Sequence, residues 1–464
     1  MQVKLEPVKQ VRALEQVRAR EQVRARVQLC AWGPLRARVQ LRALVQVALL
    51  ALALAGAALA ESNALEDCLI QRFQEKDRPR TDYAVLLATR YRHAKREQAA
   101  GHDVSRELAA IAQRCADPAR SRDLPMEKLA WADVPPLIDG GNRKLLARAL
   151  ENVAGRLGGG QVAFGTQTVS AAALARGAKR LAQLATSKLD PAELDAAVRK
   201  EFDVYRSPGA FGTGEVLYTS YASPVYEGSL TKSDRYRYPL YRSPGKAGVS
   251  TNLTRKAIYA GGLAGHDLEI AWLAERMDEF QLQIEGSGFI HLPDGGYLHA
   301  TFSAHNSHEY QSLGKAMLRD RLFRPWEIDN LAVRRYFRQH PDQERRYLEL
   351  NPSFVYFNVR RIKNLPERPE YIRERSVAAD RKVFARGQIA FADTFAPEYS
   401  ADGELTGRHP WRRFIVAADV GGAIKGAGRI DLYQGQGGES QYLADTMKEP
   451  GALYLLVPRG TPLE

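Results

Sequence analysis

The chain has 464 residues, of which 45% are hydrophobic and 26% are charged, so it is long enough for two or three domains and cannot be disordered throughout. Its formal charge is 67 − 54 = +13, and residues 1–60 hold 10 − 3 = +7 of that excess, which leaves +6 for the rest. A basic leader accounts for half of the charge, so the composition does not indicate nucleic-acid binding. The mildly basic body suits an acidic polymer such as a cell-wall glycan.

The first 60 residues are predicted to be a repetitive leader followed by a secretory signal peptide. Residues 11–46 repeat every six residues, a period that aligns no single apolar face, so a basic arm, a surface helix and a translation start placed too far upstream all stay open. The apolar run 47–60 ends in Ala58-Leu59-Ala60 and is shorter than the roughly 20 residues of a membrane-spanning helix. We therefore expect a mature chain that begins near Glu61, with an uncleaved anchor as the alternative.

Export would place Cys68 and Cys115, the two cysteines left after cleavage, in the oxidising periplasm. The pair predicts either one disulfide or two buried thiols. Because no Cys follows Ala60 directly, the sequence does not predict a lipoprotein. The spacing of the cysteines and of the His residues between 291 and 308 matches no metal-binding pattern, so we expect no metal and no other cofactor.

Changes in composition, together with Pro- and Gly-containing stretches, divide the rest of the chain into three blocks. Residues 61–206 are rich in helix formers, with helix-start signals at 103–105 and 190–191 and helical apolar spacing over 143–153, so this block is predicted to be helical. From residue 207 onward Tyr, Gly, Thr and Val increase, which predicts short strands separated by turns. A Pro-rich stretch at 365–369 separates a middle block from a C-terminal one, where strands are expected at 413–418, 428–434 and 452–458.

Asp431 is the strongest catalytic candidate in the C-terminal block. Ile430 and Leu432 should share one face of a strand, which turns Asp431 to the other face together with Arg429 and Tyr433. A carboxyl group held on a rigid strand beside an aromatic ring can act as a general acid, and a solvated or ion-paired Asp is the alternative. Asp419 is expected to cap the following glycine-rich turn or to tune Asp431.

Other motifs carry weaker signals. The glycine-rich turn 421–426 lacks the spacing of a phosphate-binding loop, and the segment 285–288 lacks the pattern of a nucleophile elbow, so both are interpreted as turns. The segment 234–242 interleaves basic and aromatic residues, which suits either stacking on sugars or a half-exposed strand.

Eight segments between residues 205 and 460, taken in order, resemble the membrane-bound lytic murein transglycosylase A family. They are 214–219, 237–241, 285–288, 292–295, 308–314, 351–355, 376–380 and 419–433. The resemblance implies a mainly β fold with a helical N-terminal region: a double-psi β-barrel (207–222 and 363–464) interrupted by an inserted β domain (223–362). A glycan groove would lie between the two domains.

The resemblance also implies roles for individual residues. The three aspartates of the C-terminal module (about 370–460) correspond to Asp380, Asp419 and Asp431, with Asp431 as the single catalytic acid/base, Asp419 as a second catalytic residue and Asp380 as a structural one. The implied substrate contacts are Tyr218, Thr219, Gly286, Ser287, Gly288, His308, Tyr310, Ser312, Gly421, Gly422, Lys425 and Tyr433.

The implied activity is lytic cleavage of peptidoglycan at the β-1,4 bond between N-acetylmuramic acid and N-acetylglucosamine, with formation of a 1,6-anhydro product and no cofactor. The expected partner is the glycan strand, with no nucleic acid. Two points stay open: whether the protein also binds proteins of cell-wall synthesis or division, and whether it associates with the outer membrane. Glu285 stands where the family usually has Gln, so a hydrolase that uses Asp431 plus Glu285 is one alternative, and a non-enzymatic wall-binding protein on the same fold is another.

Overall fold

The computed structural model describes residues 63–116, 124–245, 248–367, 370–400 and 405–464. The predicted leader, signal peptide and cleavage site lie outside these ranges. Residues from Glu66 to Glu464 form one compact unit. Within the described ranges, no helix combines the length and the apolar character that crossing a lipid bilayer requires.

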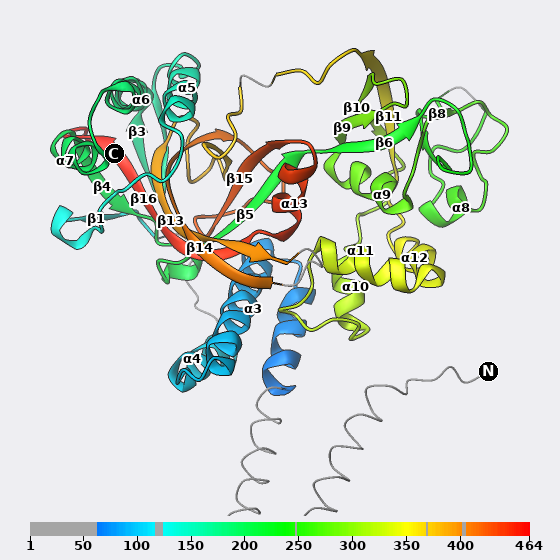
Figure 1. The fold of residues 1–464 in the computed structure, drawn as a ribbon, viewed down its shortest axis with the longest axis horizontal. Helices are drawn as coiled ribbons and strands as arrows, with labels where there is room; N and C mark the ends of the chain where they lie inside the picture. Colours follow the sequence, from blue (N-terminus) through cyan, green and yellow to red (C-terminus); the bar gives the residue numbers. More distant parts are fainter. Residues whose placement is uncertain (1–62, 117–123, 246–247, 368–369, 401–404) are drawn as a thin grey trace, which may run out of the picture. The chain divides into compact units, whose positions relative to one another are not determined.

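Six strands of this unit form a closed barrel, which lies on the left in Figure 1. Its strands are β5 (Val216–Ser223), β12 (Ser376–Ala378), β13 (Ile389–Tyr399), β14 (Leu405–Asp419), β15 (Arg429–Gln436) and β16 (Lys448–Pro458). Their order is β16-β13-β14-β12-β15-β5, and β5 pairs back onto β16, which closes the sheet. The three strands predicted in the C-terminal block are confirmed as β14, β15 and β16.

Alternation along the barrel strands decides what each face carries. Ile430 and Leu432 of β15 are 2% and 0% exposed and join Val216, Ile415 and Leu455 in one apolar core. Burial of such side chains stabilises the fold by about 1.5–3 kcal/mol each. Asp431 between them is only half-buried, so the predicted turn of this carboxylate away from the core is confirmed.

Helices of the N-terminal block surround the barrel. They are α3 (Arg78–Ala99), α4 (Ser105–Ala116), α5 (Arg143–Ala154), α6 (Ala171–Thr186) and α7 (Pro191–Glu201). The predicted start at Asp190 is confirmed, since Asp190 and Glu193 form a reciprocal capping box. Reading this block as purely helical was wrong, because it also holds the strands β1 (Glu127–Leu129), β2 (Gln161–Phe164), β3 (Gln167–Ser170) and β4 (Phe202–Arg206). Only five residues long, β4 is stabilised by pairing with β16 from the far end of the chain.

Cys68 and Cys115 form a disulfide, which selects one of the two alternatives that the sequence left open. The bond joins the helical segment before α3 to the end of α4 across a sequence separation of 47. In the chain-entropy model, closing a loop of this length stabilises the folded state by about 4 kcal/mol. The bridge therefore ties down the helical block that leads into the barrel.

Between β5 and β12 the chain builds a second sheet with its own helices. Its strands are β6 (Val225–Ser229), β7 (Tyr238–Tyr241), β8 (Glu269–Leu273), β9 (Ser287–His291), β10 (Tyr297–His305) and β11 (Val355–Ile362), in the order β11-β10-β9-β6-β8-β7. Its helices are α8 (Arg255–Tyr259), α9 (Arg276–Glu285), α10 (Leu313–Arg319), α11 (Asn330–Gln339) and α12 (Pro341–Leu348). The block is therefore mixed α/β rather than all-β. The helices α9 to α12 build an apolar core of their own around Phe280, Met317 and Phe337.

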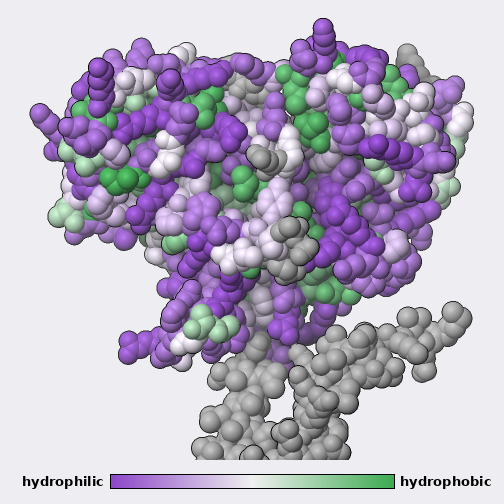
Figure 2. Space-filling view, in the orientation of Figure 1, coloured by the Kyte–Doolittle hydropathy of each residue, from purple (hydrophilic) through white to green (hydrophobic). Residues whose placement is uncertain are grey.

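Hydrophilic side chains cover most of the face shown in Figure 2, and hydrophobic residues appear there only in small patches. The largest exposed apolar side chains of the inserted block include Phe302 and Tyr310, which are 52% and 53% exposed. Aromatic rings of this kind offer flat apolar surface next to polar groups, as sugar-binding sites do.

Candidate active site

A row of paired residues crosses five neighbouring barrel strands, four of which contribute polar side chains, and it includes two of the three predicted aspartates. Lys448 of β16 pairs with Thr219 of β5, and Thr219 pairs with Asp431 of β15. Ala378 of β12 then lies between Asp431 on one side and Asp419 of β14 on the other. Directly paired residues share a face of the sheet, and neighbouring strands are about 4.8 Å apart, so the backbones of Asp419 and Asp431 lie roughly 10 Å apart.

The carboxylate of Asp431 is held by a hydroxyl group. Oγ1 of Thr219 donates a short hydrogen bond to Oδ1 of Asp431. Thr219 also accepts a hydrogen bond from Nε of Arg429 at 3.3 Å. Rigid strands on both sides carry the donor and the acceptor, so the carboxylate is oriented before any substrate arrives.

Three tyrosines surround the second aspartate. Tyr221 donates to Oδ2 of Asp419 at 2.8 Å, and Tyr371 donates to Oδ1 at 3.1 Å. The ring of Tyr433 packs 5.2 Å from that of Tyr221 and 5.9 Å from that of Tyr371. Burial raises the pKa of Tyr221 well above its usual range, and the charges of Asp419 and Asp431 raise it further. Tyr221 is therefore a permanent hydrogen-bond donor that feels both carboxylates.

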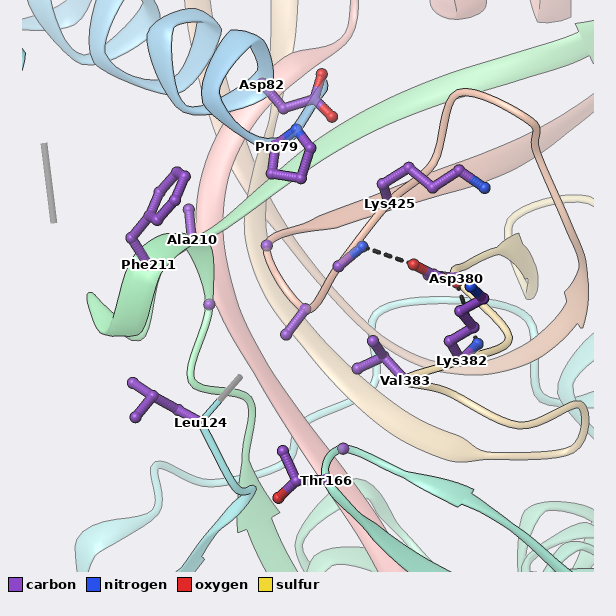
Figure 3. A pocket seen from close by; sticks show the side chains of 15 residues that line it. Pro79, Asp82, Leu124, Thr166, Ala210, Phe211, Asp380, Lys382, Val383 and Lys425 are labelled. Carbon is purple, nitrogen blue, oxygen red and sulfur yellow. Dashed lines mark hydrogen bonds between the residues drawn. The ribbon is translucent and has the colours of Figure 1, made fainter. Parts of the chain in front are cut away.

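Asp380 shapes the glycine-rich turn. Its Oδ2 accepts from the backbone N–H of Gly426 at 2.8 Å, and its Oδ1 accepts from that of Lys382 at 3.1 Å (Figure 3). Beside this turn lies a cavity of about 280 Å³, whose wall includes Asp82, Phe211 and Lys425. Asp431 does not line this cavity. We therefore place the candidate active site at the row of paired strand residues and regard the glycine-rich turn and its cavity as lying next to that site.

Contacts with the inserted block begin at the edge of the same row. The ammonium of the half-buried Lys448 donates to the backbone carbonyl of Ile328 at 2.6 Å, and desolvation by the surrounding protein lowers the pKa of Lys448. Nδ2 of Asn330 donates to Asp445 of α13 (Gly438–Thr446) at 2.9 Å. These bonds fasten the start of α11 to the barrel.

Glu285 lies at the end of α9, where Gly286 adopts a left-handed conformation with a φ of 73°. Water reaches the residue, but protein atoms crowd its carboxyl group. This desolvation, together with the charge of Asp445, raises the pKa of Glu285 to about 8, although Arg334 opposes the shift. At neutral pH the side chain is therefore largely protonated, and it can donate a hydrogen bond as an amide does.

Comparison with known proteins identifies the family. The MltA-specific insert domain model matches residues 217–358, and the 3D domain model matches residues 375–457. Membrane-bound lytic murein transglycosylase A of Escherichia coli is 33% identical over 259 residues, which cover 55% of this chain and 69% of that protein. The Vibrio cholerae protein of the same name is 31% identical over 280 residues, or 58% of this chain and 73% of that protein. The chain belongs to the membrane-bound lytic murein transglycosylase A family.

Solved structures agree with this membership of the lytic murein transglycosylase A family. A crystal structure of E. coli MltA with bound chitohexaose has a TM-score of 0.57 and 25% identity, and the match covers 74% of this chain and 96% of that one. A membrane-bound lytic murein transglycosylase from Agrobacterium tumefaciens has a TM-score of 0.54 and 26% identity over 72% of this chain and 98% of that one. The barrel with its inserted second sheet is thus the fold of this transglycosylase family.

The structure gathers some of the predicted contacts of this transglycosylase around the strand row. Thr219 touches Asp431, Tyr433 packs beside the tyrosines of Asp419, and Gly421 and Gly422 begin the turn that follows Asp419. Lys425 is exposed farther along the same turn. Tyr218 does not belong to this group, because it is completely buried and donates to the carbonyl of Ala452 inside the barrel. This placement removes Tyr218 from the expected substrate contacts.

The predicted contacts from the inserted block lie in two places. Gly286 precedes β9, and Ser287 and Gly288 are its first two residues. Gly288 has no room for a side chain beside Pro224, where the chain leaves the barrel. His308, Tyr310 and Ser312 occupy the loop between β10 and α10. His308 contacts the carbonyl of Asn252 within the inserted block, and Ser312 caps α10.

Sequence reasoning missed several residues that complete the site. Tyr221 and Tyr371 hold Asp419, and Lys448 continues the polar row, yet none of them belongs to a recognisable motif. Arg429 was placed on the face of Asp431 by alternation but was given no role. Its position two residues before Asp431 was the one available signal. In the described ranges, no group of three or more His, Cys, Asp or Glu residues is arranged to hold a metal ion.

Proposed function

We propose that this lytic murein transglycosylase cleaves the β-1,4 bond between N-acetylmuramic acid and N-acetylglucosamine with Asp431 as its single general acid/base. The observation that carries the proposal is the half-buried carboxylate of Asp431, oriented by Thr219 on a rigid barrel strand within the 3D domain match. The complex of the E. coli relative with chitohexaose supports a glycan as the ligand.

The proposed reaction needs one carboxyl group used twice. Protonated Asp431 first gives its proton to the glycosidic oxygen, and the C1–O bond to the leaving N-acetylglucosamine breaks. The resulting carboxylate then takes the proton of the C6 hydroxyl of the same muramic acid, whose oxygen bonds to C1 and closes the 1,6-anhydro ring. The nucleophile is intramolecular, and such reactions gain as much as roughly 7–11 kcal/mol over their bimolecular counterparts.

Other residues have supporting roles in this proposal. Asp419, fixed by Tyr221 and Tyr371, keeps a second negative charge near the oxocarbenium-like centre. Asp380 holds the glycine-rich turn in shape and is structural. Tyr433, of which only 3% is exposed, packs behind Tyr221 and Tyr371 and supports them instead of contacting sugar. The proposed sugar contacts are Thr219, Gly286, Ser287, Gly288, His308, Tyr310, Ser312, Gly421, Gly422 and Lys425.

The proposal extends to architecture and location. We take 207–222 with 363–464 as a catalytic barrel of the double-psi type, 223–362 as the other wall of a glycan groove, and 61–206 as an N-terminal platform. The parallel pairing of β15 with β5 and of β12 with β14 supports a barrel with crossed connections. The predicted signal peptide and the membrane-bound relatives support a periplasmic enzyme, with association with the outer membrane as a further possibility.

Analysis of the reaction products tests the proposed function. Purified peptidoglycan sacculi incubated with the enzyme should release muropeptides that end in 1,6-anhydro-N-acetylmuramic acid, which mass spectrometry distinguishes from reducing ends by the mass of one water. Reducing ends would favour the hydrolase that uses Asp431 plus Glu285. No release at all from sacculi would favour a wall-binding protein.

Replacing Glu285 with Gln tests the second carboxylate of the hydrolase alternative. The pKa of Glu285 in the folded chain is about 8, against an ordinary value of 4.5, so an uncharged amide mimics its neutral form. Between pH 4.5 and pH 8 the unfolded chain loses this proton while the folded chain keeps it, so wild-type stability falls as the pH rises through this window. The Glu285→Gln variant should lack that fall. Its melting temperature should match the wild type near pH 4 and exceed it increasingly up to about pH 8.

Activity gives the second readout for this variant. At neutral pH the Glu285→Gln enzyme should retain turnover within a few-fold of the wild type, since a protonated Glu and a Gln offer similar hydrogen bonds. A loss as large as that caused by removing Asp431 would instead support the hydrolase.

A further inference from the structure

Helix α3 reaches the candidate active site through one ion pair. Nη1 of Arg429 donates to Oδ1 of Asp82 at 2.9 Å, and the side chains of Arg429 and Asp82 are only 11% and 6% exposed. Asp82 lies outside both matched family models, which cover residues 217–358 and 375–457. Figure 3 shows this carboxylate on α3 above the strands of the barrel.

The same guanidinium contacts the residue that holds Asp431. While Nη1 of Arg429 donates to Asp82, its Nε donates to Oγ1 of Thr219 at 3.3 Å, and Thr219 in turn donates to Oδ1 of Asp431. Three hydrogen bonds therefore connect a carboxylate of the N-terminal helix to the proposed acid/base.

We propose that Asp82 is a positioning residue for Asp431: it fixes Arg429, Arg429 fixes the hydroxyl of Thr219 as a donor, and that hydroxyl fixes Oδ1 of Asp431. The inference rests on the proposed function of Asp431. It assigns the N-terminal helical block a part in catalysis that the sequence did not indicate.

The chemistry of Arg429, Thr219 and Asp431 decides which group donates in each of these hydrogen bonds. A guanidinium can only donate, and a threonine hydroxyl has one hydrogen and two acceptor lone pairs. Because Arg429 occupies a lone pair of Oγ1, the hydrogen of Thr219 turns toward Oδ1 of Asp431. With Oδ1 engaged as an acceptor, the proton that Asp431 donates and retrieves is carried by Oδ2. Asp82 restrains the guanidinium at its other end, because a bonded Arg fork loses its freedom to rotate away.

Docking of α3 does not depend on Asp82 alone. Arg90 lies eight residues after Asp82 on the same helix, which is about 12 Å along the helix axis. It donates to both carboxylate oxygens of Glu215 at 2.8 and 2.9 Å. His93 forms a buried contact with Glu449 of β16 at 2.8 Å. Because these bonds hold the helix independently, a change at Asp82 can be separated from loss of helix docking.

A double-mutant cycle on the mature enzyme, with soluble glycan strands as substrate, tests this series of hydrogen bonds. Asp82→Asn should lower kcat about tenfold and change KM less than about twofold, because one hydrogen bond to a charged group is weakened at a distance from the substrate. Thr219→Val should lower kcat about 10- to 100-fold. The double variant should be no worse than Thr219→Val within about twofold, since Asp82 acts only through Thr219. Thr219→Ser, which keeps the hydroxyl, should recover most of the turnover.

Arg90→Gln is the matched control, because it removes an ion pair of the same helix that does not touch Thr219. Its kcat should stay within about twofold of the wild type. Three results would overturn the positioning role. In the first, the double variant loses the product of the two single losses in kcat. In the second, Asp82→Asn changes only KM, and in the third, Arg90→Gln loses as much kcat as Asp82→Asn. The same series includes Asp431→Asn. If that variant is inactive while Asp82→Asn has wild-type kcat, the positioning role is wrong and the proposed function stands. If Asp431→Asn is active, both are wrong.

Discussion

Replacing Asp431 with Asn is expected to lower the release of anhydro-muropeptides by about 10²- to 10⁴-fold, the usual contribution of a positioned proton-transfer group. The amide keeps the size of the carboxyl group, and its oxygen can still accept the hydrogen bond of Thr219. It cannot donate a proton to the glycosidic oxygen and then retrieve one from the C6 hydroxyl. The melting temperature and the affinity for glycan strands should therefore stay close to those of the wild type.

Two variants calibrate this result. Asp419→Asn keeps an acceptor for only one of Tyr221 and Tyr371, which donate to different oxygens of Asp419, and it removes the second charge. Its activity should fall between that of the wild type and that of Asp431→Asn. Glu285→Gln should lose the least. Turnover by Asp431→Asn near the wild-type rate would contradict the proposed mechanism, and equal losses in Asp431→Asn and Glu285→Gln would point to a two-carboxylate hydrolase.

Replacing Asp139 with Ala is expected to cost about 3–5 kcal/mol of unfolding free energy, because it leaves a buried charge without its partner. The side chains of Arg375 and Asp139 are 1% and 0% exposed, and the guanidinium donates to both carboxylate oxygens at 2.6 and 2.8 Å. Asp139 also accepts from the backbone N–H of Phe414 in β14. The pair joins the segment before α5 to the barrel, so its loss affects both. Urea unfolding of the disulfide-intact protein measures the change.

Asp139→Asn is the milder partner variant, since the amide oxygen still accepts from Arg375, and it should lose less than Asp139→Ala. The exposed pair of Arg180 and Glu201, which are 48% and 29% exposed, provides the control. Glu201→Gln should change stability by no more than about 1 kcal/mol. A similar small change in Asp139→Ala would show that the Asp139 pair does not stabilise the fold.

Local patterns in the sequence were sufficient for features that depend on near neighbours. The capping box of Asp190 and Glu193, the helix over 143–153 and the strands around 413–418 and 428–434 follow from backbone preferences and side-chain periodicity. The outward turn of Asp431 follows from alternation, because successive side chains on a strand must point to opposite faces. The ordered motifs indicated the family, and comparison with relatives confirmed it.

Features that depend on partners distant in the sequence could not be predicted from local sequence patterns. The strand β4 exists because β16 pairs with it, and Tyr218 is buried because β5 closes the barrel against β15 and β16. Likewise, the raised pKa of Glu285 depends first on desolvation by the protein packed around its carboxyl group and then on the charge of Asp445, which lies on another helix.

The sequence by itself thus determined which residue carries the proposed chemistry and the strand that presents it. Tertiary structure decided which side chains surround that residue, because such contacts arise only when separate elements pack. Asp82 and Arg429 are 347 positions apart, and no local pattern relates them. Their ion pair forms because α3 packs against β16 and β5, and β5 is the strand that pairs with β15. The same packing brings the N-terminal block within three hydrogen bonds of Asp431.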